Sequence, residues 1–130
     1  LHWAAALPKE IGTPKEGEQP VAFVVVAKPR NASPMISDID LGIALDAMAI
    51  TAWQKGVGSA ILAAVDRKKI AALLEIPEEL EVNIVLALGY PAHKSNLVSG
   101  EKGKSLDYYV DENRDYYVPK LPLEKVAEFK

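Results

Sequence analysis

The chain has 130 residues, 49% of them hydrophobic and 25% charged, the proportions of an ordinary soluble globular protein with room for one domain. It contains no cysteine, which excludes disulfides, thiolate metal sites and cysteine nucleophiles. A net charge of −3 offers no basic surface to nucleic acid, and the longest apolar run, Val21–Ala27, is too short to span a bilayer. Because no charged-then-apolar leader opens the chain, we expect a cytoplasmic protein that binds neither nucleic acid nor membrane.

The first residues predict the end of a helix. Leu1–Leu7 is apolar, stops at Pro8 and begins without an initiator methionine. The polar residues that continue to Pro20 predict a connector with nothing to bury. We therefore expect one domain over residues 1–130 that lacks its N-terminal segment.

Two apolar stretches predict buried strands. Val21–Ala27 is hydrophobic throughout, which is typical of a central strand covered on both faces. Val82–Leu88 predicts a second buried strand. Between them, Gly58–Val65 has small residues and an extended character, and a short amphipathic helix follows and stops at Pro77.

A long helix is predicted from Ile39 to Trp53. Ser37 is a suitable N-cap, and Gly56 supplies the left-handed residue that commonly ends a helix. Apolar residues surround this helix, so it should be buried in a core or at a subunit interface. Asp46 is the exception and would need a partner if it were enclosed.

The last third of the chain alternates polar and tyrosine-rich segments. Ala92–Ser105 predicts a mobile loop. Tyr108–Val110 and Tyr116–Val118 predict a hairpin or an extended arm, closed by a short helix from about Leu123. The order of elements indicates a mixed α/β sandwich without repeats.

No motif identifies an acid, a base or a nucleophile. Gly56-Val57-Gly58 lacks the third glycine of a dinucleotide fingerprint and follows a helix, whereas the fingerprint follows a strand. His2 and His93 are far apart and without a nearby carboxylate pair, so we expect neither to bind metal or act as a base. The tyrosines of the arm could stack on a ligand ring, but packing is the commoner role of such residues. We predict no catalytic side chain and no metal site.

Three segments, taken in order, resemble the C-terminal part of the FMN-dependent nitroreductase family. They are a long helix with its glycine-rich turn, a strand that ends in Gly-Tyr-Pro, and a Val-Pro-Lys stretch: Asp40–Ser59, Leu86–Pro91 and Tyr116–Leu123. Pro14–Ala22 also resembles the connector and strand entry of the small members of that family. The resemblance covers nearly the whole chain.

The resemblance implies an α+β fold, a nitroreductase-like three-layer sandwich in which a mostly antiparallel sheet is flanked by helices. It also implies an intertwined homodimer, with the long helix at the interface and the C-terminal arm wrapped around the partner. FMN would bind at that interface. The Arg-rich N-terminal helix that holds much of the FMN in the family has no counterpart in this sequence.

Two parts of the flavin site can be carried over by position. The first passes the flavin ring and comprises Gly58, Ser59, Ala60, Ile61, Leu62 and Ala63. Small residues let the main chain approach a planar cofactor, although a tight helix-to-strand turn explains the same residues equally well. The second is Lys120, which matches a basic residue at the FMN phosphate; a solvated surface lysine is the alternative, and Leu121 stands where that subgroup usually has arginine.

The resemblance therefore implies an FMN-dependent oxidoreductase that passes electrons from NAD(P)H to a nitroaromatic, quinone or similar small acceptor. The flavin would carry the chemistry, which is consistent with a sequence that has no catalytic motif. A non-catalytic flavin-binding or structural dimer of the same fold is the alternative, and a third possibility is an ordered fragment of a complete enzyme.

Overall fold

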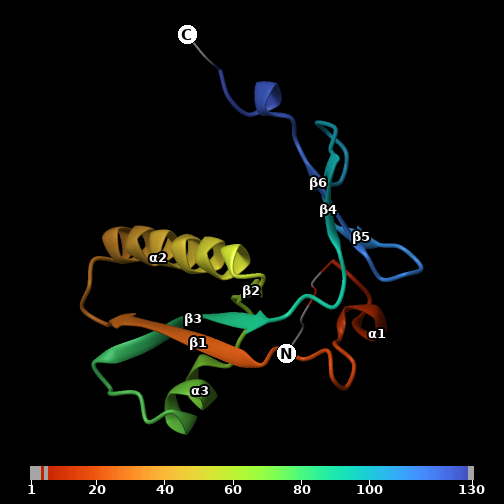
Figure 1. Ribbon diagram of the computed structural model, residues 1–130. Helices are drawn as coiled ribbons and strands as arrows, with labels where there is room; N and C mark the ends of the chain where they lie inside the picture. Colours follow the sequence, from red (N-terminus) through yellow and green to blue (C-terminus); the bar gives the residue numbers. More distant parts are fainter. Residues whose placement is uncertain (1–3, 5, 129–130) are drawn as a thin grey trace. The chain divides into compact units, whose positions relative to one another are not determined.

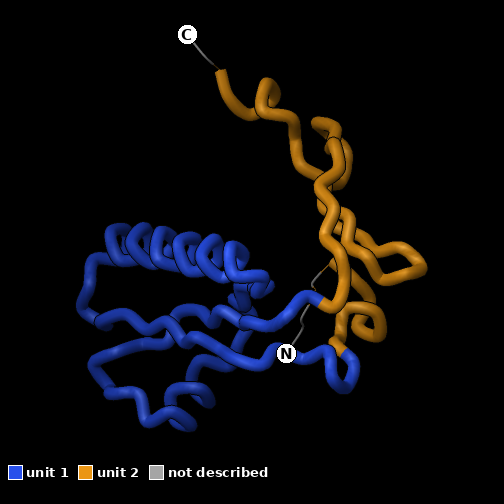
Figure 2. The backbone as a smooth tube through the Cα atoms, in the orientation of Figure 1, with its two compact units in different colours: residues 1, 15–91 blue, residues 2–14, 92–130 orange. Residues whose placement is uncertain are grey.

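The structure, a computed structural model, describes Ala4 and residues 6–128. It divides into two compact units (Figure 2). The first unit comprises Lys15–Pro91, and the second joins the N-terminal residues up to Pro14 to the chain from Ala92 onward. The single domain expected from the sequence stays a prediction.

The first unit contains a three-stranded antiparallel sheet in the order β1-β3-β2. β1 spans Ala22–Pro29, β2 spans Gly58–Leu62 and β3 spans Leu80–Gly89. β3 is the central strand, and its Leu86 side chain is fully buried. The prediction that the first strand is central and covered on both faces is wrong: β1 lies at an edge, and its residues are at most half-buried. A continuous apolar run indicates that both faces meet apolar neighbours, but it does not determine which strands pair.

Two helices lie on opposite sides of this sheet (Figure 1). They are α2, Pro34–Gln54, and α3, Arg67–Leu73. An ion pair of 2.7 Å between Lys28 Nζ and Asp38 Oδ1 ties α2 to the sheet face that carries Lys28 and its register partner Glu81. Because side chains alternate along β1, Val26 lies on the same face as Lys28, and this face therefore also carries Ile84 of β3, the register partner of Val26. The predicted arrangement of helices around an antiparallel sheet is confirmed for this unit.

The long helix begins earlier than predicted. Its N-cap is Ser33 and Pro34 is its first residue, whereas Ser37 lies inside the helix and its Oγ donates to the Pro34 carbonyl at 3.2 Å. The prediction of Ser37 as N-cap is wrong because proline, with its fixed φ, is well suited to the first helical position. The predicted stop is confirmed: Gly56 has φ 75°.

The two sides of α2 differ in burial. The side toward the sheet is covered and consists of Leu41, Leu45, Met48 and Ala52. The other side is apolar but exposed; we call it the outer stripe, and it consists of Ile36, Ile39, Ile43, Ile50 and Trp53. The helix is therefore not enclosed within the described part of this chain, and Asp46 is exposed. The subunit interface remains as the predicted cover for the outer stripe.

The second unit contains a small mixed sheet in the order β4-β6-β5. β4 (Ser95–Ser99) runs parallel to β6 (Tyr116–Lys120), and β5 (Tyr109–Val110) runs antiparallel to it. The tyrosine-rich hairpin is confirmed, and a 3₁₀ helix at Leu123–Lys125 matches the short helix predicted there. The prediction of a loop throughout Ala92–Ser105 is wrong, because β4 pairs along its whole length with β6.

The N-terminal prediction is only partly covered by the structure. Residues 1–3 and 5 of the expected helix Leu1–Leu7 lie outside the described residues, and Leu7 is in a bend rather than a helix. The expected connector instead holds a short helix, α1, at Lys9–Gly12. Gly12 is buried there, and a Cβ on it would come within 2.8 Å of the Ala4 Cβ. The connector therefore does bury residues, contrary to the prediction. No helix in the described part of the chain is long and apolar enough to cross a membrane.

Candidate functional site

β2 forms an open edge of the first sheet. It pairs with β3 from Gly58–Gly89 to Leu62–Val85, and no strand among the described residues pairs with its other edge. In an antiparallel pair, alternate residues turn their N–H and C=O groups toward the partner strand, and the remaining residues turn them outward. The outer edge of β2 therefore offers backbone donors and acceptors to a ligand.

The residues expected beside a flavin ring lie on this strand and directly after it. Gly58, Ser59, Ala60, Ile61 and Leu62 form β2, and Ala63 follows. The alternative of a tight helix-to-strand turn is wrong for these residues. The turn comes before them, where the Val57 N–H donates to the Ala52 carbonyl at 2.9 Å.

Most side chains at this edge are small or exposed. Ser59, Ala60, Ile61 and Ala63 are exposed, whereas Leu62 is buried, so only the backbone of Leu62 can meet a ligand. Small side chains let a flat ring approach the main chain closely. An open backbone edge of this kind fits a planar ligand whose rim carries nitrogen and oxygen atoms, as the flavin ring does.

Gly58 also has a purely structural reason to be glycine. A Cβ at this position would lie 3.1 Å from Pro91 Cγ and 3.3 Å from the Gly89 carbonyl oxygen. Contacts this close require the neighbours to shift. The absence of a side chain at Gly58 is therefore explained by packing against Pro91 as well as by access for a ligand.

Lys120 lies in the second unit, at the end of β6. Its register partner on β4 is Ser99, and its carbonyl accepts the Gly100 N–H at 2.8 Å. The side chain is exposed and makes no ion pair with any residue that the structure describes, so its ammonium can take an anion. The next residue, Leu121, is half-buried. The structure thus brings the six residues of the first part together and places Lys120 in the other unit.

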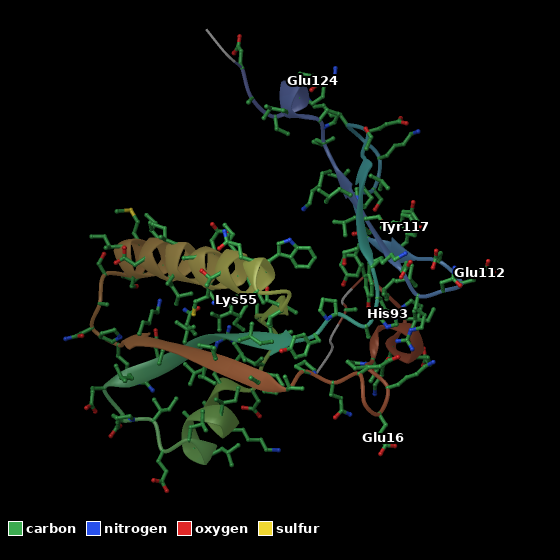
Figure 3. The ribbon with its side chains drawn as sticks, viewed as in Figure 1. Glu16, Lys55, His93, Glu112, Tyr117 and Glu124 are labelled. Carbon is green, nitrogen blue, oxygen red and sulfur yellow. The ribbon has the colours of Figure 1, made fainter. Side chains whose placement is uncertain are left out.

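The histidines do not form a site within the described chain. His93 is half-buried, with its ring centroid 6.4 Å from that of Tyr116, and Figure 3 labels it. His2 lies outside the described residues. Among the described residues, no group of three or more His, Cys, Asp or Glu side chains is placed to hold a metal ion.

The tyrosines of the arm pack on one another. Tyr109 and Tyr117 stack with ring centroids 5.3 Å apart and planes 9° apart. The Tyr117 hydroxyl donates to Asp111 Oδ2 at 3.2 Å, and this hydrogen bond, followed by the charge of Asp111, raises the pKa of Tyr117 above its usual 10.0. Asp111 Oδ1 accepts the N–H groups of Asn113 and Asp115 at 2.9 and 3.0 Å, which closes the turn at the end of the hairpin. The predicted packing role of these tyrosines is confirmed for this pair.

Sequence reasoning missed one charged cluster. Lys28 Nζ lies 2.7 Å from Asp38 Oδ1 and 3.8 Å from Glu81 Oε1. The hydrogen bond to Asp38 raises the pKa of Lys28 above its usual 10.5, and the charges of Asp38 and Glu81 add to this, whereas partial burial opposes it. The sequence signal that could have indicated this cluster is a lysine at the end of an apolar strand. Since the cluster joins α2 to the sheet, its role is structural.

Comparisons with known proteins give a fold and a family. The chain is similar to a crystal structure of a variant of the FMN- and NADPH-dependent nitroreductase NfnB from Sphingopyxis sp. strain HMH, with a TM-score of 0.60 and 15% sequence identity. The match covers 83% of this chain and 42% of that chain, so this chain spans less than half the length of that relative. At this identity the likeness shows the fold alone. A search of curated proteins gave no match.

The model of the nitroreductase family matches residues 6–90, which is well over half of the 130 residues. The matched range includes β1, α2, β2 and β3 and therefore the whole first part of the candidate site. The chain belongs to the nitroreductase family.

Proposed function

We propose that this chain serves an FMN-dependent oxidoreductase that passes electrons from NAD(P)H through bound FMN to a nitroaromatic, quinone or similar acceptor. The observation that carries the proposal is the open, small-residue edge of β2 in a chain of the nitroreductase family. Bound FMN supplies the redox chemistry by accepting a hydride and passing the electrons on. The chain's own residues bind and orient the flavin and its partners.

Two groups of residues have roles in this proposal. The backbone of Ser59, Ala60 and Ile61 meets the polar rim of the flavin ring, while buried Leu62 anchors the strand in the sheet. Lys120 of the second unit is the residue that the family resemblance assigns to the FMN phosphate, for which a lysine is a suitable point charge. Its neighbour Leu121 adds no second charge there, so the phosphate is held less firmly than by a Lys-Arg pair.

A homodimer is the second part of the proposal. The outer stripe of α2 is a helix face about five turns long, apolar except for the exposed Asp46, and nothing in the described chain covers it. A surface of this kind on a small unit is typical of a protein interface. A second copy of the chain offers the same stripe and buries both at once.

The flavin proposal is tested with the purified chain. We expect visible flavin absorbance, or its appearance after FMN is added, and oxidation of NADH or NADPH in the presence of a nitroaromatic or quinone. Flavin binding without oxidation of either nicotinamide would favour the non-catalytic alternative. A colourless protein that gains no flavin would contradict both readings.

A matched pair of variants tests the site itself. Ala60 on β2 and Ala22 on β1 are both exposed alanines on edge strands of the same sheet. Ala60→Leu should lower the flavin content, because the longer side chain keeps a ring away from the strand. Ala22→Leu should leave it unchanged. Equal flavin content in the two variants would remove β2 from the site.

A further inference from the structure

Two large aromatic side chains are exposed where β2 begins. Trp53, on the last turn of α2, is 68% exposed, and Tyr90, directly after β3, is 79% exposed. Aromatic side chains of this size usually bury most of their surface, and their polar tips usually find partners. Two of them exposed at one point of the same unit therefore indicate a surface that binds something.

Trp53 is held close to Gly58 by the turn that joins α2 to β2. The Gly56 N–H donates to the Trp53 carbonyl at 2.9 Å, and Gly58 lies two residues further along. Figure 3 labels Lys55, which caps α2 within this turn.

Tyr90 reaches the same point from β3. The residue before it, Gly89, is the register partner of Gly58. Paired Cα atoms in an antiparallel sheet are about 5 Å apart and consecutive ones about 3.8 Å, so the Tyr90 Cα lies within about 9 Å of the Gly58 Cα. Pro91, packed against Gly58, holds the segment in place.

We propose that Trp53 and Tyr90 select flat aromatic electron acceptors by stacking against their rings, an inference that rests on the proposed function. Both residues border Gly58, the first residue of the open strand: the turn brings Trp53 close to it, and Gly89, its register partner, directly precedes Tyr90. A planar ligand that reaches the start of β2 can therefore contact either ring. Indole and phenol rings are electron-rich, and rings that carry nitro or quinone oxygens are electron-poor, so the faces attract one another. A compact inorganic acceptor such as ferricyanide has no ring face and gains nothing from either residue.

The test compares two acceptors in four variants of the flavin-loaded protein. Trp53→Leu and Tyr90→Ser remove the rings, and Met35→Ala is the control. Met35 is an equally exposed apolar residue of α2, but it lies 18 residues before Trp53, about 27 Å along the helix. The measurements are KM and kcat with 4-nitrobenzoate and with ferricyanide, flavin content, and the calorimetric Kd of 4-nitrobenzoate without NAD(P)H.

We expect each ring deletion to raise both KM and Kd for 4-nitrobenzoate by about 5-fold to 100-fold, the usual range for one aromatic stack. In Tyr90→Ser, the KM for ferricyanide and the flavin content should not change, and Met35→Ala should behave as the wild type does. Because Trp53 also belongs to the outer stripe, Trp53→Leu is compared at protein concentrations at which it sediments as the wild type does, with FMN added to saturation. Trp53→Phe, which keeps a ring, should restore most of the affinity for 4-nitrobenzoate.

Several results would overturn the inference. An equal effect on both acceptors, or none on either, would show that the rings do not select the acceptor. Loss of dimer in Trp53→Leu with equal loss of both activities would assign Trp53 to the subunit interface instead. A wild type that holds no flavin contradicts the proposed function, and calorimetry still decides the inference: 4-nitrobenzoate must bind, and bind more weakly to both variants.

Discussion

The proposed role of the outer stripe of α2 in dimer formation predicts how much Ile43 contributes to the stability of the homodimer. Ile43 lies in the middle of the stripe and is 64% exposed. Full burial of an isoleucine side chain is worth about 1.5–3 kcal/mol, so covering the exposed part is worth about 1–2 kcal/mol. A symmetric dimer uses the stripe twice, which doubles the loss to about 2–4 kcal/mol. Ile43→Ala should therefore raise the dimer Kd by about 30-fold to 700-fold.

Sedimentation velocity over a range of protein concentrations measures this shift. Leu73→Ala is the matched control, because Leu73 is more exposed, at 78%, but lies on α3, outside the stripe. It should sediment as the wild type does, and urea unfolding should show that both variants fold. A wild type that stays monomeric at every concentration, or an equal shift in the two variants, would refute the assignment of the stripe to the interface.

Three further predictions concern stability and titration. Leu86→Ala removes a fully buried side chain from the central strand and should cost about 2–5 kcal/mol in urea unfolding; a loss below about 1 kcal/mol would contradict the burial. Because the hydrogen bond to Asp38 raises the folded-state pKa of Lys28, the pair stabilises the fold below the ordinary lysine pKa and is lost as pH rises through the raised value. Asp38→Asn should then lower the free energy of unfolding at neutral pH and reduce the decrease in that free energy as the pH rises through the pKa of Lys28. If the decrease is the same in the variant, the ion pair does not stabilise the fold. Asp111→Asn should lower the titration midpoint of Tyr117, followed by tyrosinate absorbance, and no shift would mean that the hydrogen bond does not form in solution.

Local signals in the sequence predicted the helices better than the pairing of strands. The end of α2 is set by Gly56, a single residue with positive φ, and such a signal can be read from the chain alone. The edge position of β1 cannot be read from the sequence, because hydrophobicity indicates which faces of a strand are covered but not which strands pair with it. β4 was missed for a related reason. Its alternation is weak, and its partner β6 begins about twenty residues later, at Tyr116.

The candidate site was predicted through family resemblance rather than through chemistry. Residue patterns alone gave no acid, base or nucleophile, and the six residues from Gly58 to Ala63 became candidates only through their position after a long helix. The structure adds that five of them form an open strand edge and that Leu62 is turned inward. The exposure of Trp53 and Tyr90 could not be predicted, because it depends on which neighbours the fold brings to these two residues.

The outer stripe and the candidate flavin strand are coupled by their place in the first unit. α2 packs against β2, and Trp53 belongs both to the stripe and to the turn that leads into the strand. If a second copy covers the stripe, then dissociation uncovers the end of the flavin site as well. Dilution of Ile43→Ala should therefore release FMN over the same concentration range in which the dimer dissociates, whereas the wild type, with its lower Kd, should retain FMN there. Flavin fluorescence, which rises when FMN enters water, follows the release beside the sedimentation measurement. Release at a concentration unrelated to dissociation would show that the first unit binds flavin without help from a partner.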